Sequence, residues 1–186
     1  MNLDEIFNRK LLIISGKGGV GKTTVGRILK KQIKGSVLYN PEWFGSVLMR
    51  LPINFRGSGT DDFQDLDLWR KSVVYGIKLF RFFARETVIV PMAFSRKDYF
   101  EEILREISQF DNKIRIFCLK AGFEIIVKRL QHRGEKIEES ENNWTIRKAR
   151  ICLKAHKNDF FGESIDTTGI NAGEVAAEIL KRMSKT

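Results

Sequence analysis

Two patterns of apolar residues alternate along the chain. Short strand-like segments, of which residues 11–14 (LLII) form a continuous apolar run, are separated by longer stretches in which apolar residues recur every three or four positions. A continuous run is typical of a strand that helices cover on both faces, and the three-to-four spacing is typical of a helix with one buried face. The pattern predicts strands at residues 11–14, 36–39, 87–90, 114–119 and 164–166.

Helices are predicted between and after these strands. Two of them begin at capping sequences, Ser95 with Asp98 and Asn171 with Glu174, in which a short polar side chain accepts from the first free N–H groups of a helix. Strands that alternate with helices predict an α/β fold with a parallel sheet, and residues 1–186 form one domain because no linker or repeat interrupts the pattern. The predicted helices are residues 22–34, 42–51, a segment around 69–80, a segment after Ser95 through 108, 123–133, 144–156 and a last helix after Asn171.

Composition and charge narrow the function classes. The chain has 186 residues with 42% hydrophobic and 30% charged side chains, which is ordinary for a folded domain with a sizeable core. Its formal charge of +10 has two explanations, binding to nucleic acid or an anionic membrane, or binding of a polyanionic small molecule such as ATP. The basic residues are spread along the chain rather than gathered in a block, so no nucleic-acid partner is expected.

Several classes of protein are disfavoured. The apolar runs are too short to cross a bilayer, so no transmembrane segment is expected, and the first ten residues (MNLDEIFNRK) do not resemble a signal peptide. Cys118 and Cys152 are interpreted as reduced, buried residues of a cytoplasmic protein. No cluster of Cys and His has the spacing of a metal site.

The most informative motif follows the first predicted strand. Residues 11–24 (LLIISGKGGVGKTT) contain the spacing G-x-x-x-x-G-K-[ST] of a phosphate-binding loop. Glycines let backbone N–H groups turn toward phosphate oxygens, Lys22 supplies a positive charge, Thr23 offers a hydroxyl to Mg²⁺, and a helix N-terminus faces the anion. The predicted ATP-binding residues are Gly16, Lys17, Gly18, Gly19, Val20, Gly21, Lys22, Thr23 and Thr24.

The additional lysine of this loop resembles another class of protein. GKGGVGKT, with Lys17 beside the first glycine, is similar to the deviant phosphate loop of chromosome-partitioning and septum-site ATPases. In that family the extra lysine reaches the phosphates of a partner subunit, which implies a homodimer. The resemblance ends at the loop, because strand two leads to Asn40-Pro41-Glu42 and strand three to Pro91-Met92, where those ATPases carry aspartates.

A second resemblance covers nearly the whole chain and rests on motifs in a consistent order. They are Tyr39-Asn-Pro-Glu42, Asp61-Asp-Phe-Gln64, Leu68-Trp-Arg70, Val88-Ile-Val-Pro-Met92, Tyr99-Phe100, Lys128-Arg-Leu130 with Arg133, Trp144 and Ile165-Asp166. Together they resemble the tunicamycin-resistance protein family, small ATP-binding proteins of the nucleoside- and shikimate-kinase-like group. The resemblance implies a phosphate-loop fold with strand order 2-3-1-4-5, helices on both faces and a mobile lid before the last strand. Lys17 departs from the family's loop.

Basic residues support a lid at about residues 129–150. Arg129 and Arg133 are four apart on one predicted helix, and Arg150 shares a face of the next helix with Arg147 and Lys154. The polar loop at residues 134–143 separates the two helices. Arginines placed here can offset charge on a transferring phosphoryl group, although a solvated basic face paired with nearby glutamates is the alternative.

Acidic residues are the candidates for binding and activating an acceptor hydroxyl. Glu42 follows strand two, where open α/β sheets bind their ligands, and Asp61 and Asp62 form a second candidate pair. Strand three ends without the usual Mg²⁺-binding acid, so Thr23 is expected to hold the metal together with Glu42 or an aspartate.

Aromatic residues near these acids have two interpretations. They either form an apolar acceptor pocket or simply belong to the core. Trp43 is the one that we expect to contact the substrate; the others are Phe44, Phe55, Phe63 and Trp69.

These observations predict an ATP- and Mg²⁺-dependent phosphotransferase that acts on a hydroxyl of a small molecule. The expected catalytic residues are Lys22, Glu42, Arg129 and Arg133, with Glu42, Trp43, Asp61, Asp62 and Arg150 on the substrate side. Two alternatives stay open: a protein that sequesters a drug with ATP closing the site, and an ATPase switch that dimerises through Lys17. The sequence does not identify the acceptor.

Overall fold

A computed structural model of the chain describes residues 10–52, 59–84, 87–134 and 159–185. Its centre is a five-stranded sheet in the order β2-β3-β1-β4-β5, and every neighbouring pair of strands is parallel. The α/β class and the strand order expected from the sequence are therefore confirmed. The strands are β1 (Leu11–Gly16), β2 (Val37–Leu38), β3 (Val88–Pro91), β4 (Ile114–Lys120) and β5 (Glu163–Asp166).

Pro91 is the last residue of β3, whereas the sequence predicts that the strand ends at residue 90. It pairs in register with Ile14 of β1. The N–H groups of Val88 and Met92 point toward β1, so the intervening Pro91 faces the β2 side. Pro91 has no N–H to continue the ladder with β2, whose last hydrogen bond runs from Tyr39 N to Ile89 O, whereas the ladder with β1 continues through Met92 N.

Helices connect the strands largely where the apolar spacing predicts them. The described α-helices are α2 (Lys22–Gln32), α3 (Pro41–Leu48), α5 (Asp67–Ala84), α6 (Lys97–Ser108), α7 (Phe123–His132) and α9 (Ala172–Met183), with short 3₁₀ helices η1 (Phe63–Asp65) and η2 (Asp159–Phe161). The predicted helix at residues 144–156 lies outside the described residues, as do most of the predicted lid, Arg150 and Cys152.

One of the two predicted helix caps is confirmed and the other is wrong. Asn171 accepts from the N–H groups of Gly173 and Glu174, and the Glu174 carboxylate accepts from the N–H of Asn171. Ser95 does not cap α6, whose N-cap is Arg96 without a side-chain hydrogen bond. Its hydroxyl donates instead to the side chain of Gln64 at 3.1 Å, a tertiary contact that local sequence does not reveal.

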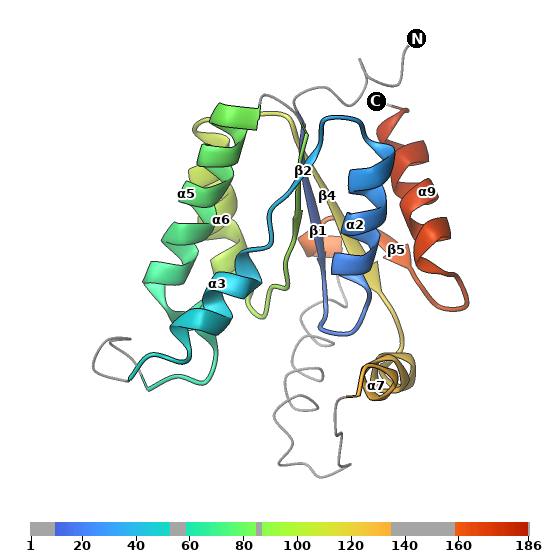
Figure 1. The fold of residues 1–186 in the computed structure, drawn as a ribbon, viewed down its shortest axis with the longest axis horizontal. Helices are drawn as coiled ribbons and strands as arrows, with labels where there is room; N and C mark the ends of the chain where they lie inside the picture. The colour runs from blue at the N-terminus through green and yellow to red at the C-terminus, as the bar shows by residue number, and fades with distance from the viewer. Residues whose placement is uncertain (1–9, 53–58, 85–86, 135–158, 186) are drawn as a thin grey trace.

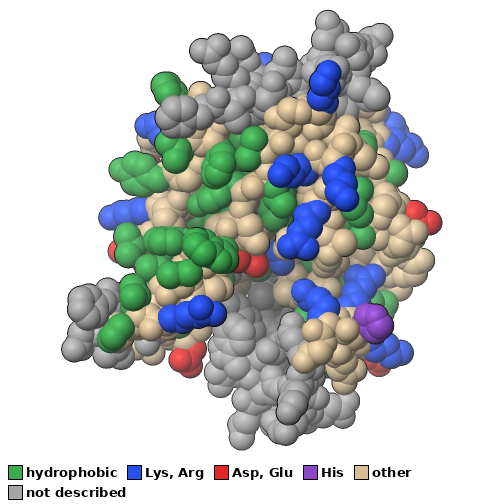
Figure 2. All heavy atoms as spheres, viewed as in Figure 1, with side chains coloured by type: hydrophobic (Ala, Val, Ile, Leu, Met, Phe, Trp, Pro, Cys, Tyr) green, Lys and Arg blue, Asp and Glu red, His purple; other side chains and the backbone are tan. Residues whose placement is uncertain are grey.

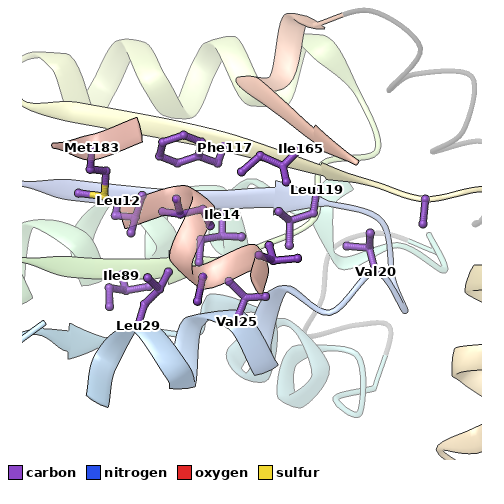
Figure 3. Packing of buried hydrophobic residues seen from close by; sticks show 14 of the residues in the cluster. Leu12, Ile14, Val20, Val25, Leu29, Ile89, Phe117, Leu119, Ile165 and Met183 are labelled. Atoms are coloured by element: carbon purple, nitrogen blue, oxygen red, sulfur yellow. The ribbon is translucent and has the colours of Figure 1, made fainter. Parts of the chain in front are cut away.

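The sheet lies between two helical layers, each with its own apolar core (Figure 1). Alternate residues of β1 serve the two sides: Leu12 and Ile14 pack with α2 and α9, and Leu11 and Ile13 pack with α5 and α6. Figure 3 shows the first cluster, in which Val25 and Leu29 of α2 approach the strands. This arrangement exposes the carboxyl ends of the strands, where the phosphate loop begins.

Among the described residues, no helix is both long and apolar enough to cross a membrane. Cys118 is buried in β4 and is in no disulfide bond with any described residue.

Candidate active site

The phosphate loop connects the end of β1 to the start of α2, and positive φ angles at Gly16, Gly19 and Gly21 shape its backbone. Gly16 has φ 137°, and a Cβ there would lie 2.6 Å from the carbonyl oxygen of Leu119. Gly21 is the N-cap of α2 with φ 103°, and no side chain caps the helix. The first N–H groups of α2 are thus left for an anion, as a phosphate site needs.

Lys22 is held with its ammonium group over this loop. The side chain is buried, and Nζ donates to the carbonyl oxygen of Lys17 at 2.9 Å. Thr23, directly after it on the first turn of α2, is half-buried, and Thr24 is exposed. Lys17 itself is only 3% exposed.

Glu42 lies opposite Lys22. Asn40 caps α3 by accepting from the N–H of Glu42 at 3.1 Å, which fixes the first turn of that helix. The N–H of Ala93 donates to Glu42 Oε1 at 2.6 Å, and Lys22 Nζ lies 3.9 Å from the same oxygen. The ends of β1, β2 and β3 therefore bring together one cation and one anchored carboxylate, as the sequence predicted for this edge of the sheet.

Gln64 also helps to position the segment that follows β3. The sequence gives it no role of its own beyond its place in the motif Asp61-Asp-Phe-Gln64. It is fully buried, and its Oε1 accepts from both the N–H and the hydroxyl of Ser95, at 3.0 and 3.1 Å. Gln64 and Glu42 hold the segment after β3 through N–H groups two residues apart, at Ser95 and Ala93. No neighbouring pattern in the sequence indicates this long-range contact.

The acidic pair after residue 60 occupies a structural turn. Asp62 caps η1 by accepting from the N–H of Gln64 at 3.1 Å, whereas Asp61 is exposed. The turn packs against α3 and α5. Asp62 is therefore explained by the local fold, and its predicted role toward substrate or metal is a separate proposal.

The aromatic residues divide between core and surface. Trp69 is fully buried, donates from Nε1 to the carbonyl of Pro41 at 3.1 Å, and packs on Phe63 with ring centroids 5.0 Å apart. Trp43, which follows Glu42, is 71% exposed. Most of the predicted aromatic pocket is thus core, Phe55 lies outside the described residues, and Trp43 is free to meet a molecule bound near Glu42.

A cavity of about 670 Å³ lies on the other side of the phosphate loop. It is bounded by the loop, by α7 and by the segment between β5 and α9, and its size suits a nucleotide. One wall of the cavity is formed by four side chains from α7 and the residue that follows it, three basic residues and one histidine: Lys128, Arg129, His132 and Arg133. Figure 2 shows blue Lys and Arg side chains near the purple histidine at the lower right.

The two arginines on this wall have different surroundings. Arg129 donates to the carbonyl of Val20 in the phosphate loop at 3.3 Å and to the carbonyl and hydroxyl of Thr167 at 2.8 and 2.9 Å. It ties α7 to the loop and to the end of β5. Arg133, at the C-terminal end of α7, is exposed. Only Arg133 of the pair is therefore free to reach a phosphoryl group without breaking described contacts.

The segment after β5 is fixed by its own hydrogen bonds. Thr167 donates from N and Oγ1 to the carbonyl of Lys120, at 2.8 and 3.0 Å. Hydrogen bonds from Thr168, one of them from its N–H at 2.9 Å, hold the pKa of Asp166 below its usual range. The wall opposite α7 is accordingly preformed.

The loop suits ATP, and the metal ligands are few. Gly16, Gly21 and Lys22 form an anion cradle beside a nucleotide-sized cavity. In the parts of the chain that the structure describes, no group of three or more His, Cys, Asp or Glu side chains could hold a metal ion. The hydroxyl of Thr23, on the first turn of α2, is an oxygen ligand of the kind that Mg²⁺ accepts while it keeps several waters.

Sequence comparisons identify no relatives. No protein-family model matches the chain. No curated protein sequence matches it either.

Comparison with solved structures gives clear fold neighbours. The tunicamycin resistance protein of Deinococcus radiodurans is 21% identical with a TM-score of 0.72, covering 93% of this chain and 94% of that chain. A shikimate kinase from Acinetobacter baumannii is 18% identical, with TM-score 0.68 and coverage of 99% and 98%. A gluconokinase from Sinorhizobium meliloti is 16% identical, with TM-score 0.67 and coverage of 96% and 94%. The chain therefore has the fold of phosphate-loop small-molecule kinases.

Proposed function

We propose that this protein transfers the γ-phosphoryl group of ATP to a hydroxyl group of a small molecule. The observation that carries the proposal is the pair formed by Lys22 and Glu42, whose side chains lie 3.9 Å apart with Glu42 anchored on the N–H of Ala93. A cation that binds phosphates and a carboxylate that binds an acceptor hydroxyl are the two groups that this reaction needs at its centre. The kinase fold neighbours support the same class of reaction.

The proposed reaction assigns one task to each side chain. The acceptor oxygen forms a bond to the γ-phosphorus, the bond from phosphorus to the bridging oxygen breaks with its electron pair leaving on ADP, and the hydroxyl proton passes to Glu42. Lys22 binds the β- and γ-phosphates, and Arg133 reaches the transferring group from α7. Arg129 acts through position, because its hydrogen bonds keep α7 against the phosphate loop.

Few side chains of the protein are proposed to bind Mg²⁺. When bound, Mg²⁺ neutralises charge on the β- and γ-phosphate oxygens. The Thr23 hydroxyl, next to Lys22 at the start of α2, would hold it, with Glu42 contributing through water. Asp61, Asp62, Trp43 and Arg150 are proposed on the acceptor side, as expected from the sequence.

The acceptor is proposed to be small and rich in hydroxyl groups. The gluconokinase and shikimate kinase among the fold neighbours suggest gluconate and shikimate as probes, and the resemblance to tunicamycin-resistance proteins adds tunicamycin. Nucleosides, aminoglycosides and chloramphenicol-like alcohols complete the panel. ADP release with ATP and Mg²⁺ is measured for each compound, and we expect one acceptor class to raise it well above the rate without acceptor.

Three variants make this experiment decisive. Lys22→Ala and Glu42→Gln should both lose the acceptor-dependent rate, while Glu101→Gln, an exposed carboxylate on α6, should keep it. Tight binding of ATP and tunicamycin without ADP release would support the drug-sequestering alternative instead. Nucleotide-dependent dimerisation lost in Lys17→Ala would support the ATPase switch.

A further inference from the structure

Helix α5 has a second apolar face, which points away from the core. Its inner face buries Trp69, Val73 and Ile77. On the opposite side, four large apolar side chains are each between 56% and 75% exposed: Leu68, Tyr75, Leu79 and Phe82. Figure 2 shows hydrophobic side chains gathered at the left, over the region where Figure 1 places α5 and α3. We call the four residues, together with Ser72 between them, the α5 seam.

The spacing of the α5 seam is that of a helix-pairing surface. Positions 68, 72, 75, 79 and 82 are separated by four, three, four and three residues, which is the a/d repeat of a coiled coil. This stripe is narrow, whereas a helix that lies on a lipid surface presents a wide apolar face. The spacing therefore favours another helix as the partner.

The exposed area is large enough for a weak dimer. Two aromatic and two leucine side chains at these exposures present on the order of 500 Å² of apolar surface, more than isolated surface residues usually do. If two copies paired through the seam, about 1,000 Å² would be buried in total, which is close to the lower end for specific interfaces. Interfaces near this lower end are typical of weak, transient association rather than of obligate dimers.

The α5 seam is complementary to itself in an antiparallel arrangement. With a two-fold axis between Tyr75 and Leu79, each of these residues faces the other residue of the second copy. In the next layer the small Ser72 faces the large Phe82 of the second copy, and the pair fills one layer of a coiled-coil core. Four of the five seam positions therefore pair with one another in this register, and Leu68 lies beyond these layers.

We propose that α5 is the contact through which two copies of this chain associate, antiparallel, with Tyr75 and Leu79 at the centre. The seam carries no charged residue, and Lys71 and Lys78 flank it. The Lys78 ammonium lies 5.8 Å from the centroid of the Phe110 ring, toward the groove between α5 and α6 that Glu102 and Glu106 also line. Because each copy has a formal charge of +10, added salt should strengthen the association.

Sedimentation velocity of the full chain tests the proposal. Between about 1 and 200 μM we expect the sedimentation coefficient to rise from that of a monomer to that of a dimer, at lower concentration in about 0.5 M than in 0.05 M salt. Leu79→Glu should weaken association by at least about 100-fold, because two charges enter the centre of the seam. The matched control, Ala177→Glu, adds the same charge at an exposed position on α9 and should associate like wild type or better.

Three outcomes would overturn the proposal. The first is a monomer at the highest concentration in both salts, and the second is a dimer that Leu79→Glu leaves intact. The third is a monomer that instead binds vesicles containing phosphatidylserine, with binding lost in high salt and in Leu79→Glu; the seam would then meet a lipid surface. The unfolding midpoint of Leu79→Glu should match that of wild type, because this side chain is exposed in the single copy.

Cross-linking tests the antiparallel register. Ser72→Cys and Phe82→Cys are made separately in a Cys152→Ser background, and the two proteins are mixed under mild oxidation. The mixture should give a disulfide-linked heterodimer, whereas either variant alone should not, because two copies of the same position lie too far apart in this register. Cross-linking of each variant with itself at equal yield would contradict the antiparallel arrangement.

Discussion

Single residues of the phosphate loop differ in how strongly the backbone requires glycine. At Gly16 a left-handed φ of 137° coincides with a Cβ position 2.6 Å from a backbone oxygen, whereas a Cβ at Gly18 meets nothing within 4 Å. Gly16→Ala should therefore lower the free energy of unfolding by about 2–4 kcal/mol, and Gly18→Ala by less than about 0.5 kcal/mol. Urea unfolding of the two variants measures both values.

The comparison between these two positions is informative because both lie in the same loop. If Gly16→Ala were as stable as wild type, the close contact with Leu119 described here would be wrong. Equal losses at both positions would show that the loop needs glycine for a reason other than local geometry.

The residues whose proximity can be expected from the sequence are those with local signals. Lys22 follows from the phosphate-loop spacing, and Glu42 from its position after a strand, and the structure brings them within 3.9 Å. Gln64 and Ser95 are 31 residues apart and meet only through the fold. The sequence alone does not indicate that Asp62 caps η1, and its predicted role toward substrate or metal stays a prediction.

At the scale of elements, Arg129 in α7 and Arg133 at its C-cap should differ in how their substitution affects stability and activity. Arg129→Ala removes hydrogen bonds to Val20 and Thr167, so it should destabilise the protein by about 1.5–3 kcal/mol and raise the Kd for ATP at least about tenfold. Arg133→Ala, at an exposed site, should leave stability and ATP binding unchanged and lower kcat about tenfold or more. Calorimetric titration with ATP and steady-state kinetics separate the two.

A reversed pattern would contradict the roles given to these arginines. Loss of ATP binding in Arg133→Ala with normal binding in Arg129→Ala would mean that Arg133 holds ATP before the phosphoryl transfer and that the hydrogen bonds of Arg129 do not shape the nucleotide site.

A second element-scale prediction concerns the contact between η1 and α6. The Tyr99 hydroxyl donates to Asp65 at 2.7 Å, and partial burial together with this hydrogen bond raises the pKa of Tyr99 to about 12. The folded state thus keeps a proton that the unfolded chain loses near pH 10, so stability should fall as the pH rises from about 10 to 12. Absorbance titration of tyrosinate should show a component near pH 12 that is missing in Tyr99→Phe.

The control for this titration is Asp65→Asn, which keeps the tyrosine and removes the charge that disfavours its ionisation. The Tyr99 component should then move toward the ordinary tyrosine pKa. A component that stays near pH 12 in Asp65→Asn would mean that burial alone sets the pKa.

The elements themselves were predicted well because their signals are periodic. Apolar spacing located the helices and strands to within a few residues, and the capping box at Asn171 is a local interaction. Two predictions were wrong for physical reasons. Ser95 makes a tertiary contact instead of a local helix cap, and Pro91 extends β3 beside the short strand β2. The apolar spacing predicts the inner face of α5 but not the exposure of its outer apolar residues, because exposure depends on what packs against the helix.

For the whole molecule, the strand order and the two layers of helices follow from alternating strands and helices together with the family resemblance. The sheet edge where β1, β2 and β3 end positions Lys22 and Glu42, and the cavity between α7 and α9 lies beside the same loop. A kinase needs this combination of a nucleotide cavity and an adjacent carboxylate. This combination does not identify the acceptor. Only a few side chains would contact an acceptor, and they follow no periodic pattern in the sequence.

The most direct test of the central claim is mass spectrometry of the acceptor after incubation with protein, ATP and Mg²⁺. Wild type should add one phosphoryl group to one acceptor class and form ADP in equal amount. Folded Glu42→Gln should still bind ATP with a Kd within about threefold of wild type but lower kcat by about 10²–10⁴, and Lys22→Ala should lose transfer. Transfer retained in folded Lys22→Ala, or ADP formed with inorganic phosphate and no modified acceptor, would contradict the account.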